Sequence, residues 1–208
     1  EESVFNFEIN KNGEKAESAQ TTHFTIMDSD GNVITSTQTI NGLFGAGILV
    51  PETGIFLNNE MDDFSAKEGS TNLFGAIGGN KNLVKGGKRP LSSMTPTLVF
   101  QAGRPVLALG SPAGTKIITC VAQTILNYLE YGMSLYDSVS LVRTHYQVSP
   151  NYILMEEKGL PTETIKGLKK IGYKLSEGQI GCRVQAISYK NGLFGVSDPR
   201  GFGLAEGI

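Results

Sequence analysis

Short apolar runs occur in pairs along this chain, and each pair is joined by a tight turn. The clearest pair is 23–28 and 33–39, joined at Asp30-Gly31, a dipeptide typical of hairpin turns. Two further hairpins are predicted, one over 97–109 around Ala102-Gly103-Arg104 and one over 184–196 around Lys190-Asn191-Gly192. Such pairing restricts the chain to folds with largely antiparallel sheets.

Helical segments separate these hairpins. Apolar residues recur with a 3.6-residue period over 117–129, and Gly132 is placed to end that helix. Shorter helices are predicted over 134–143 and 161–171. Hairpins alternating with helices indicate an α+β fold. A length of 208 residues with 39% hydrophobic content suits a single core.

Charge excludes one class of partner and leaves localisation open. The formal net charge is −2, and there is no cluster of Lys and Arg of the kind that binds nucleic acid. No apolar run reaches the roughly 20 residues that span a bilayer, and the start of the chain lacks the order of a signal peptide. The compartment therefore cannot be predicted from these residues.

Residues 1–20 differ from the rest of the chain in composition. They hold five Glu and two Lys, and a short apolar strand at 4–9 gives way to a polar tether ending in Gln20. Exposed polar tethers tolerate cleavage. Residues 1–20 are therefore compositionally separate from the domain expected over 21–208.

The two cysteines, Cys120 and Cys182, lie far apart in sequence and in apolar surroundings. They have neither metal-ligand spacing nor a CxxC arrangement. Buried free thiols are the favoured prediction, with a disulfide as the alternative.

Thr21 follows the tether directly and opens the first hairpin. If the bond from Gln20 to Thr21 were cut, Thr21 would carry a free α-amine beside its hydroxyl. An α-amine titrates near pH ~8 and can take the proton of the hydroxyl, so one residue would supply nucleophile and base. The alternative is that Thr21-Thr22 reflects only the strand preference of β-branched residues.

Several polar groups are candidates to surround Thr21. Antiparallel pairing would bring Thr39 and Asn41 level with it. Glu60, Asp62 and Asp63 repel one another unless they bind a cation or face solvent, and a substrate ammonium would satisfy them. A metal is conceivable there, but His23 and His145 lie far away in sequence and the spacing matches no metal-binding loop.

Two other segments suit an anionic ligand. Ser92 and Ser93 precede a strand and can donate to a carboxylate. The sequence Gly110-Ser111-Pro112-Ala113-Gly114 places backbone N–H groups just ahead of a helix, where they can stabilise an oxyanion; an ordinary strand-to-helix turn is the alternative. Residues 66–88 show no period, which indicates a long loop and a plausible lid.

From Thr21 onward the chain resembles the small catalytic subunit of gamma-glutamyltransferase (gamma-glutamyl transpeptidase), an N-terminal nucleophile hydrolase. The resemblance rests on seven motifs in order: TTHF, TxTIN, FGAGI, GIFLNNEMDDFS, KRPLSSM, GSPAG and SDPR. It implies a four-layer αββα fold completed by a separate large subunit from the same precursor. It implies no cofactor and no metal. It also implies a periplasmic, secreted or outward-facing membrane-anchored enzyme.

The resemblance assigns roles to individual residues. Thr21, exposed by autocleavage after Gln20, attacks the gamma-glutamyl amide of glutathione and related compounds, and water or an amino acid or peptide acceptor takes the acyl group. The other roles are assistance of the nucleophile by Thr39, binding of the donor α-amine by Asn41, Glu60 and Asp63, binding of its α-carboxylate by Ser92 and Ser93, and an oxyanion hole from Ala113 and Gly114.

The chain also departs from the family pattern. Ala113 stands where Gly is common, and should serve if its φ is negative. Phe74 stands where many members carry a lid tyrosine, so it keeps an aromatic gate that cannot hydrogen-bond Asn41. The large-subunit arginine that clamps the donor carboxylate is absent. Residues 1–20, which the resemblance implies are the tail of the large subunit or a propeptide segment, still precede the small-subunit domain 21–208. The rival interpretations are a related acylase or poly-gamma-glutamate processing enzyme, and an unprocessed, non-catalytic glutamyl-binding protein.

Overall fold

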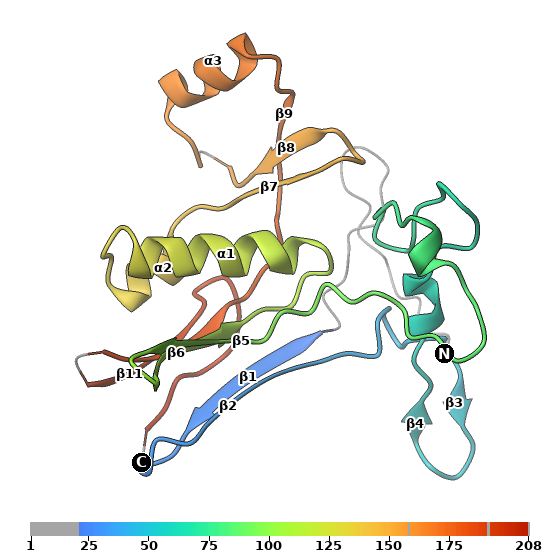
Figure 1. The fold of residues 1–208 in the computed structure, drawn as a ribbon, viewed down its shortest axis with the longest axis horizontal. Coiled ribbons are helices and arrows are strands. Elements are labelled where there is room, and N and C mark those ends of the chain that lie inside the picture. The colour runs from blue at the N-terminus through green and yellow to red at the C-terminus, as the bar shows by residue number, and fades with distance from the viewer. Residues whose placement is uncertain (1–20, 158, 191, 208) are drawn as a thin grey trace, which may run out of the picture.

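A four-stranded antiparallel sheet forms the centre of the computed structural model, which describes residues 21–157, 159–190 and 192–207 (Figure 1). Its strand order is β11-β10-β6-β5. The bounds are Thr97–Gln101 for β5, Arg104–Gly110 for β6, Gln185–Tyr189 for β10 and Leu193–Ser197 for β11. Both predicted hairpins are confirmed, and β10 joins them by pairing with β6.

The first hairpin forms a separate two-stranded sheet of β1 (Thr22–Met27) and β2 (Val33–Gln38). The Asp28 carboxylate closes its turn by accepting hydrogen bonds from the Asp30 and Asn32 backbone N–H groups at 3.0 and 2.8 Å. The hairpin packs on β6 and β10. Its inward-facing His23 lies so close to Gly110 that an added Cβ there would be 2.2 Å from the imidazole.

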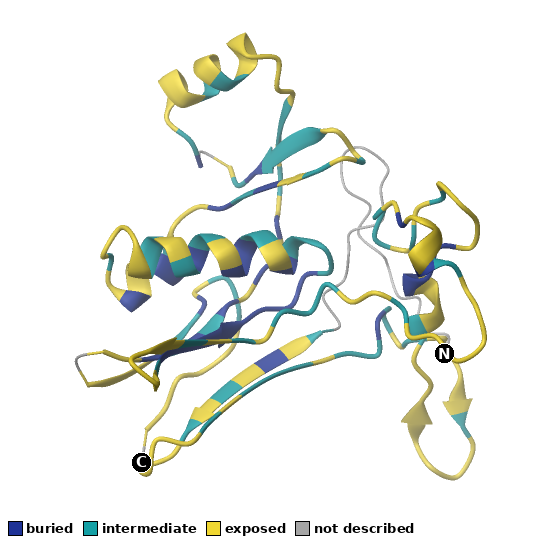
Figure 2. Ribbon diagram, viewed as in Figure 1, coloured by how far each residue is buried: buried dark blue, intermediate teal, exposed yellow. Residues whose placement is uncertain are grey.

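Two helices cover the opposite face of the central sheet (Figure 1). They are α1 (Lys116–Leu129) and α2 (Leu135–Ser140). Figure 2 shows the buried side of α1 facing the sheet, where Leu109, Ile117, Val139 and Val184 lie in one apolar core. The described residues therefore form a helix layer and two sheet layers. The fourth layer of the expected αββα fold stays a prediction.

The C-terminal end of α1 agrees with the sequence prediction, while that of α2 does not. Gly132 has φ +65°, the left-handed conformation expected just beyond the end of α1. The predicted helix over 134–143 is wrong at its C-terminus: α2 ends at Ser140, Leu141 is extended, and the chain turns into strand β7. Arg143 is buried and forms an ion pair with Asp198. This contact with a distant part of the chain fixes the backbone there outside a helix.

A small outer unit was only partly expected. The strands β7 (Thr144–Gln147), β8 (Tyr152–Met155) and β9 (Leu175–Glu177) form a third sheet, in which β8 and β9 are parallel. The predicted third helix is confirmed as α3 (Thr162–Lys170), which connects β8 to β9. None of its three strands was predicted from the sequence.

The segment between β2 and β5 is almost entirely loop. It holds the two-residue strands β3 (Leu49–Val50) and β4 (Ile55–Phe56) and the short 3₁₀ turns η1 (Glu60–Asp63) and η2 (Asn80–Asn82). The predicted long loop over 66–88 is tied down by isolated bridges, one from Ser65 to Leu83 and one from Thr71 to Ile77. The predicted strand at 4–9 and its tether lie outside the described residues.

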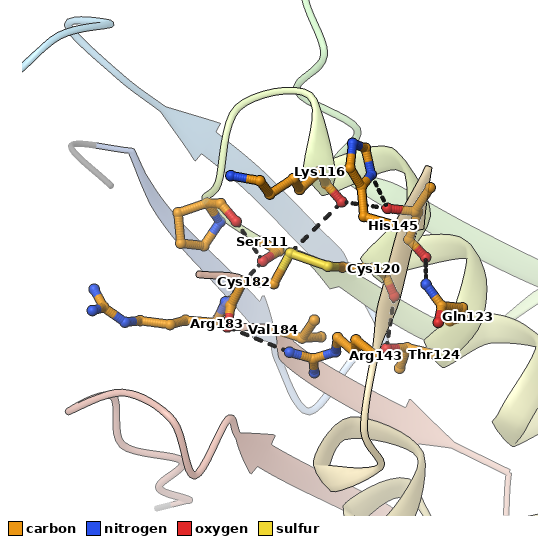
Figure 3. Close-up of a disulfide and its surroundings, with 12 residues drawn as sticks. Ser111, Lys116, Cys120, Gln123, Thr124, Arg143, His145, Cys182, Arg183 and Val184 are labelled. Atoms are coloured by element: carbon orange, nitrogen blue, oxygen red, sulfur yellow. Dashed lines mark hydrogen bonds between the residues drawn. A yellow bond between two sulfur atoms is a disulfide. The ribbon is translucent and has the colours of Figure 1, made fainter. Parts of the chain in front are cut away.

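The prediction of free thiols is wrong, because Cys120 and Cys182 form a disulfide (Figure 3). The fold brings α1 against the segment that leads into β10, with the two Cα atoms 6.5 Å apart. A sequence separation of 62 residues carried no sign of this proximity. In the described part of the chain, no helix combines the length and apolarity needed to cross a bilayer.

Candidate active site

Thr21 stands at the start of β1, level with Thr39. The register pairs Thr22 with Gln38, so the next pair outward is Thr21 with Thr39. The Thr21 hydroxyl donates a hydrogen bond to Oγ1 of Thr39 at 3.1 Å. Thr39 Oγ1 also accepts from the Asn41 backbone N–H at 2.8 Å. The predicted proximity of these residues is confirmed.

The acidic turn η1 reaches this point through Asn41. The Asn41 side-chain amide donates to Oδ1 of Asp63 at 3.3 Å and to the Asn59 carbonyl at 3.2 Å. Asn41 and Asp63 are both buried. Asn41 has φ +73°, a left-handed conformation that Asn tolerates better than most residues. This geometry turns the end of β2 toward the acidic cluster.

The pKa values of Glu60 and Asp63 are both raised, mainly by burial. Burial is the main cause that raises the pKa of Asp63, while hydrogen bonds from Asn41 and Glu60 oppose the rise. Burial also raises the pKa of Glu60, helped by repulsion from Asp63. Within the described residues, no Lys or Arg forms an ion pair with them. The site is therefore short of a positive charge.

No metal site accounts for the acidic turn. The described residues contain no group of three or more His, Cys, Asp or Glu side chains placed to hold a metal ion. A cationic group on a ligand would relieve the crowding of Glu60 and Asp63.

One small cavity joins these elements. It is lined by the predicted site residues Thr21, Thr39, Asn41, Glu60, Asp63, Phe74, Ser92, Ser93 and Gly114, together with Asn72, Leu91, Met94 and Ile117. Segments from five parts of the sequence thus meet at the Thr21 hydroxyl. Among the described residues to which the resemblance assigns a role, only Ala113 is outside this lining, and the candidate Asp62 is outside it as well.

The two serines reach the cavity from the loop before β5. Asn82 fixes that loop, because its Oδ1 accepts from the Leu91 backbone N–H at 3.0 Å and its amide donates to the Asp63 carbonyl at 2.8 Å. Asn72 also donates to the Asp63 carbonyl, at 3.4 Å. Neither asparagine was among the predicted site residues, and the density of Asn in the loop was the only sequence signal for them.

The turn between β6 and α1 presents backbone donors to the cavity. In the part of the chain that the structure describes, neither the Ala113 nor the Gly114 N–H donates to an acceptor. The condition placed on Ala113 is not met, because its φ is +126° and not negative. The turn requires the conformation that glycine adopts freely, and Ala113 holds it at a steric cost.

Phe74 closes one side of the cavity. Its ring lies directly against Gly114, where an added Cβ would be 2.8 Å from the ring. Its backbone is held by the Asn72 side chain, whose Oδ1 accepts from the Phe74 N–H at 3.0 Å. An aromatic wall is therefore in place; its opening as a lid stays a prediction.

Thr21 also borders a second, larger cavity of about 540 Å³. That cavity lies along β1, β10 and residues 202–206, and Arg183 lines it. On the hairpin beside it, the buried His23 ring is hydrogen-bonded to Thr37 and Thr35 at 2.7 and 2.9 Å. Burial lowers the pKa of His23 to about 4, so the ring is neutral at pH 7.

Known proteins are similar to this chain in sequence. The family model for gamma-glutamyltranspeptidase matches residues 3–208. The chain is 44% identical over 186 residues to a glutathione hydrolase proenzyme of Escherichia coli, covering 88% of this chain and 32% of that protein. It is 44% identical over 193 residues to one of Bacillus subtilis, covering 91% and 31%. The chain thus spans about one third of the length of these curated relatives.

Solved structures agree. A gamma-glutamyltranspeptidase from Pseudomonas nitroreducens has a TM-score of 0.84 and 39% identity, covering 90% of this chain and 99% of that chain. A variant of the Helicobacter pylori gamma-glutamyltranspeptidase has a TM-score of 0.82 and 39% identity, covering 86% and 100%. The predicted α+β N-terminal nucleophile hydrolase fold is confirmed. The chain belongs to the gamma-glutamyltranspeptidase family.

Proposed function

We propose that this chain supplies the catalytic residues of a gamma-glutamyltransferase that also hydrolyses glutathione. The observation that carries the proposal is the single cavity in which the Thr21 hydroxyl, a cation-deficient acidic pair and two serines meet. A gamma-glutamyl donor presents one α-ammonium and one α-carboxylate. The ammonium is opposite in charge to the acidic pair, and the carboxylate can accept hydrogen bonds from the two serines.

Catalysis begins with cleavage between Gln20 and Thr21. The liberated α-amine of Thr21 takes the proton of its own hydroxyl, and the oxygen attacks the gamma-glutamyl carbonyl carbon. Thr39 orients that oxygen through its 3.1 Å hydrogen bond. Collapse of the tetrahedral intermediate expels the amine, whose nitrogen takes the proton held by the Thr21 α-ammonium. Water or an amino acid or peptide acceptor then attacks the threonyl ester and takes the acyl group, and the Thr21 hydroxyl is restored.

The binding roles follow from charge and geometry. Asn41, Glu60 and Asp63 receive the α-ammonium, whose positive charge favours the ionised carboxylates that burial disfavours by raising the pKa of Glu60 and Asp63. Ser92 and Ser93 donate to the α-carboxylate. The Ala113 and Gly114 N–H groups stabilise the oxyanion, since both lack an acceptor in the described part of the chain.

A cleaved precursor explains the lengths of the relatives. The chain covers about one third of the curated proenzymes but 99% of the Pseudomonas nitroreducens chain. Residues 21–208 make up about nine-tenths of this sequence, which agrees with the share matched in that structure. We therefore place the boundary between subunits at Thr21, with residues 1–20 as the tail of the preceding one.

The partner is the large subunit from the same precursor. Among the described residues, no helix covers the outer face of β1 and β2, and Phe24, Ile26 and Ile34 are exposed there. A helical layer from the large subunit would bury them and complete the αββα fold. We also place the enzyme outside the cytoplasm, because the Cys120–Cys182 disulfide persists in oxidising compartments.

A related transpeptidase is the second candidate. Bacillus anthracis CapD has a TM-score of 0.69 and 25% identity with this chain. The Asn41–Asp63 hydrogen bond and the crowded Glu60 favour a donor with a free α-amine. Assays with glutathione, polyglutamate and glutaryl amides separate this candidate and acylases from the proposed activity.

Protein expressed as the full precursor tests the proposal. N-terminal sequencing should find a chain that begins at Thr21. Thr21→Ala should abolish both cleavage and turnover, and Thr21→Ser should keep part of each. Thr22→Ala is the matched control and should be cleaved normally. Normal glutathione turnover by Thr21→Ala would refute the assignment.

A further inference from the structure

The turn that carries the oxyanion donors holds an unfavourable backbone conformation. Ala113 has φ +126° although it is not glycine. Such conformations persist only where the surrounding structure fixes them. Ala113 is itself buried and belongs to the same apolar core cluster as Ile180 and Cys182. Contacts from elsewhere in the fold must therefore hold this turn.

The segment 178–184 is in contact with the turn. This segment has no regular secondary structure. The Arg183 backbone N–H donates to Oγ of Ser111 at 3.0 Å, and the same hydroxyl, fully buried, donates to the Pro112 carbonyl at 2.7 Å. Gly181 faces the side chain of Ala113, since a Cβ on Gly181 would lie 4.0 Å from the Cβ of Ala113.

The disulfide connects this segment to the helix that follows the turn (Figure 3). Cys120 lies on α1, less than two turns of helix after Gly114, and Cys182 precedes Arg183. The Cys182 sulfur lies 3.6 Å from the Lys116 carbonyl oxygen, a packing contact because a disulfide sulfur carries no proton. Arg143 holds the other side of the segment by donating to the Cys182 carbonyl at 3.3 Å.

We propose that the Cys120–Cys182 disulfide is a positioning element for catalysis, which holds segment 178–184 against Ser111 and Ala113 and so fixes the oxyanion donors. The inference rests on the proposed function, since it concerns the same turn. The covalent link and the Arg183–Ser111 hydrogen bond close a small ring around the turn. Loss of either lets Ala113 relax toward negative φ and moves both N–H groups.

The experiment uses the complete two-subunit enzyme and a chromogenic gamma-glutamyl anilide, which contains no thiol. Replacing both cysteines by alanine should lower kcat about tenfold or more, because misplaced oxyanion donors act on the transition state. The KM should stay within about twofold, because the acidic pair and the serines are untouched. Thermal unfolding is recorded for every variant, and assays are run well below the midpoint.

Ala113→Gly supplies the readout that a stabilising role alone would not move. Glycine adopts φ +126° without a Cβ penalty, so the turn should keep its shape without the disulfide. In this background, the cysteine replacements should lower kcat by no more than about threefold. Val139→Ala, which removes buried atoms from the same core, is the control that should lower the unfolding midpoint and leave kcat unchanged.

Ser111→Ala tests the other half of the ring with the disulfide intact, and decides the matter if the cysteine variant does not fold. It should also lower kcat with little change in KM. If the parent enzyme shows Thr21-dependent turnover and the variants keep its kcat, the inference is wrong. If the parent shows no such turnover, the proposed function itself fails.

Discussion

Two groups of buried and half-buried charged side chains in this protein differ in charge balance. In the first group, two arginines form ion pairs with two carboxylates. Arg143 contacts Asp198 at 2.7 Å, and Arg200 contacts Glu156 at 2.7 Å. Arg200 also contacts Asp198 at 3.1 Å. Near Thr21, the acidic turn η1 has no such partner in the described part of the chain.

The two groups show how structure and function divide in this fold. Buried charges are costly unless they are paired and hydrogen-bonded, and the arginine cluster meets both conditions with residues of this chain. Glu60 and Asp63 meet neither fully, and burial raises the pKa of both. A balanced cluster joins elements of the fold, while an unbalanced one is suited to receive a cationic group of a ligand.

The largest expected effect is on the balanced cluster. Arg143→Ala would leave Asp198 buried with less compensation, and Asp198 is only 1% exposed. Breaking a buried pair in this way costs about 3–5 kcal/mol of unfolding free energy, measured by denaturant titration. Lys166→Ala breaks an exposed pair with Glu163 and should cost less than about 0.5 kcal/mol. Equal losses would contradict the distinction between the two kinds of pair.

The next effect is on the unbalanced cluster, and it should appear in binding. Asp63→Asn keeps the shape but removes the charge that meets the donor ammonium. The donor kcat/KM should fall by about 30- to 1,000-fold, mainly through KM, which corresponds to roughly 2–4 kcal/mol. Steady-state kinetics with a gamma-glutamyl anilide measure this.

The matched control for Asp63 is its neighbour Asp62. Asp62 is exposed, its carboxylate accepts a hydrogen bond only from Asn59 among the described residues, and it does not line the cavity. Asp62→Asn should therefore change donor kinetics by less than about twofold. A large loss for Asp62→Asn with little for Asp63→Asn would show that the ammonium site is misplaced.

The smallest effect is on stability and pH. Because burial and Asp63 raise the pKa of Glu60, the folded state disfavours the ionised form. The corresponding stability is present at acidic pH and is lost as the pH rises through the raised pKa. The Gln side chain of Glu60→Gln cannot ionise. At pH 7 the free energy of unfolding of this variant should therefore exceed that of the parent by less than about 1 kcal/mol, measured by denaturant titration. The two proteins should converge near pH 4; a constant difference would count against charge as the cause.

Sequence patterns predicted those parts of the molecule that depend on local geometry. The Asp30-Gly31 turn set the register of the first hairpin, and that register alone brings Thr39 level with Thr21. Apolar periodicity predicted α1 because one face of that helix is buried. The order of the motifs then indicated, through the family resemblance, that the loops carrying Asp63 and Ser92 contribute to the same site as Thr21.

Sequence could not predict contacts between segments that are distant along the chain. Nothing local to Cys120 or Cys182 indicates their bond, because the packing of α1 against the segment before β10 creates it. The positive φ of Ala113 was not predicted either, and its surroundings include Gly181, which is distant along the chain. The Asn72 and Asn82 supports of Asp63 are likewise properties of the folded loop.

The central claim is that Thr21 is the nucleophile, with its own α-amine as base. The most direct test is mass spectrometry of the complete enzyme, quenched while it turns over a slow gamma-glutamyl donor. A glutamyl ester on a peptide that begins at Thr21 is the predicted result. Turnover by protein whose peptides still join Gln20 to Thr21, or an adduct on any other residue, would contradict it.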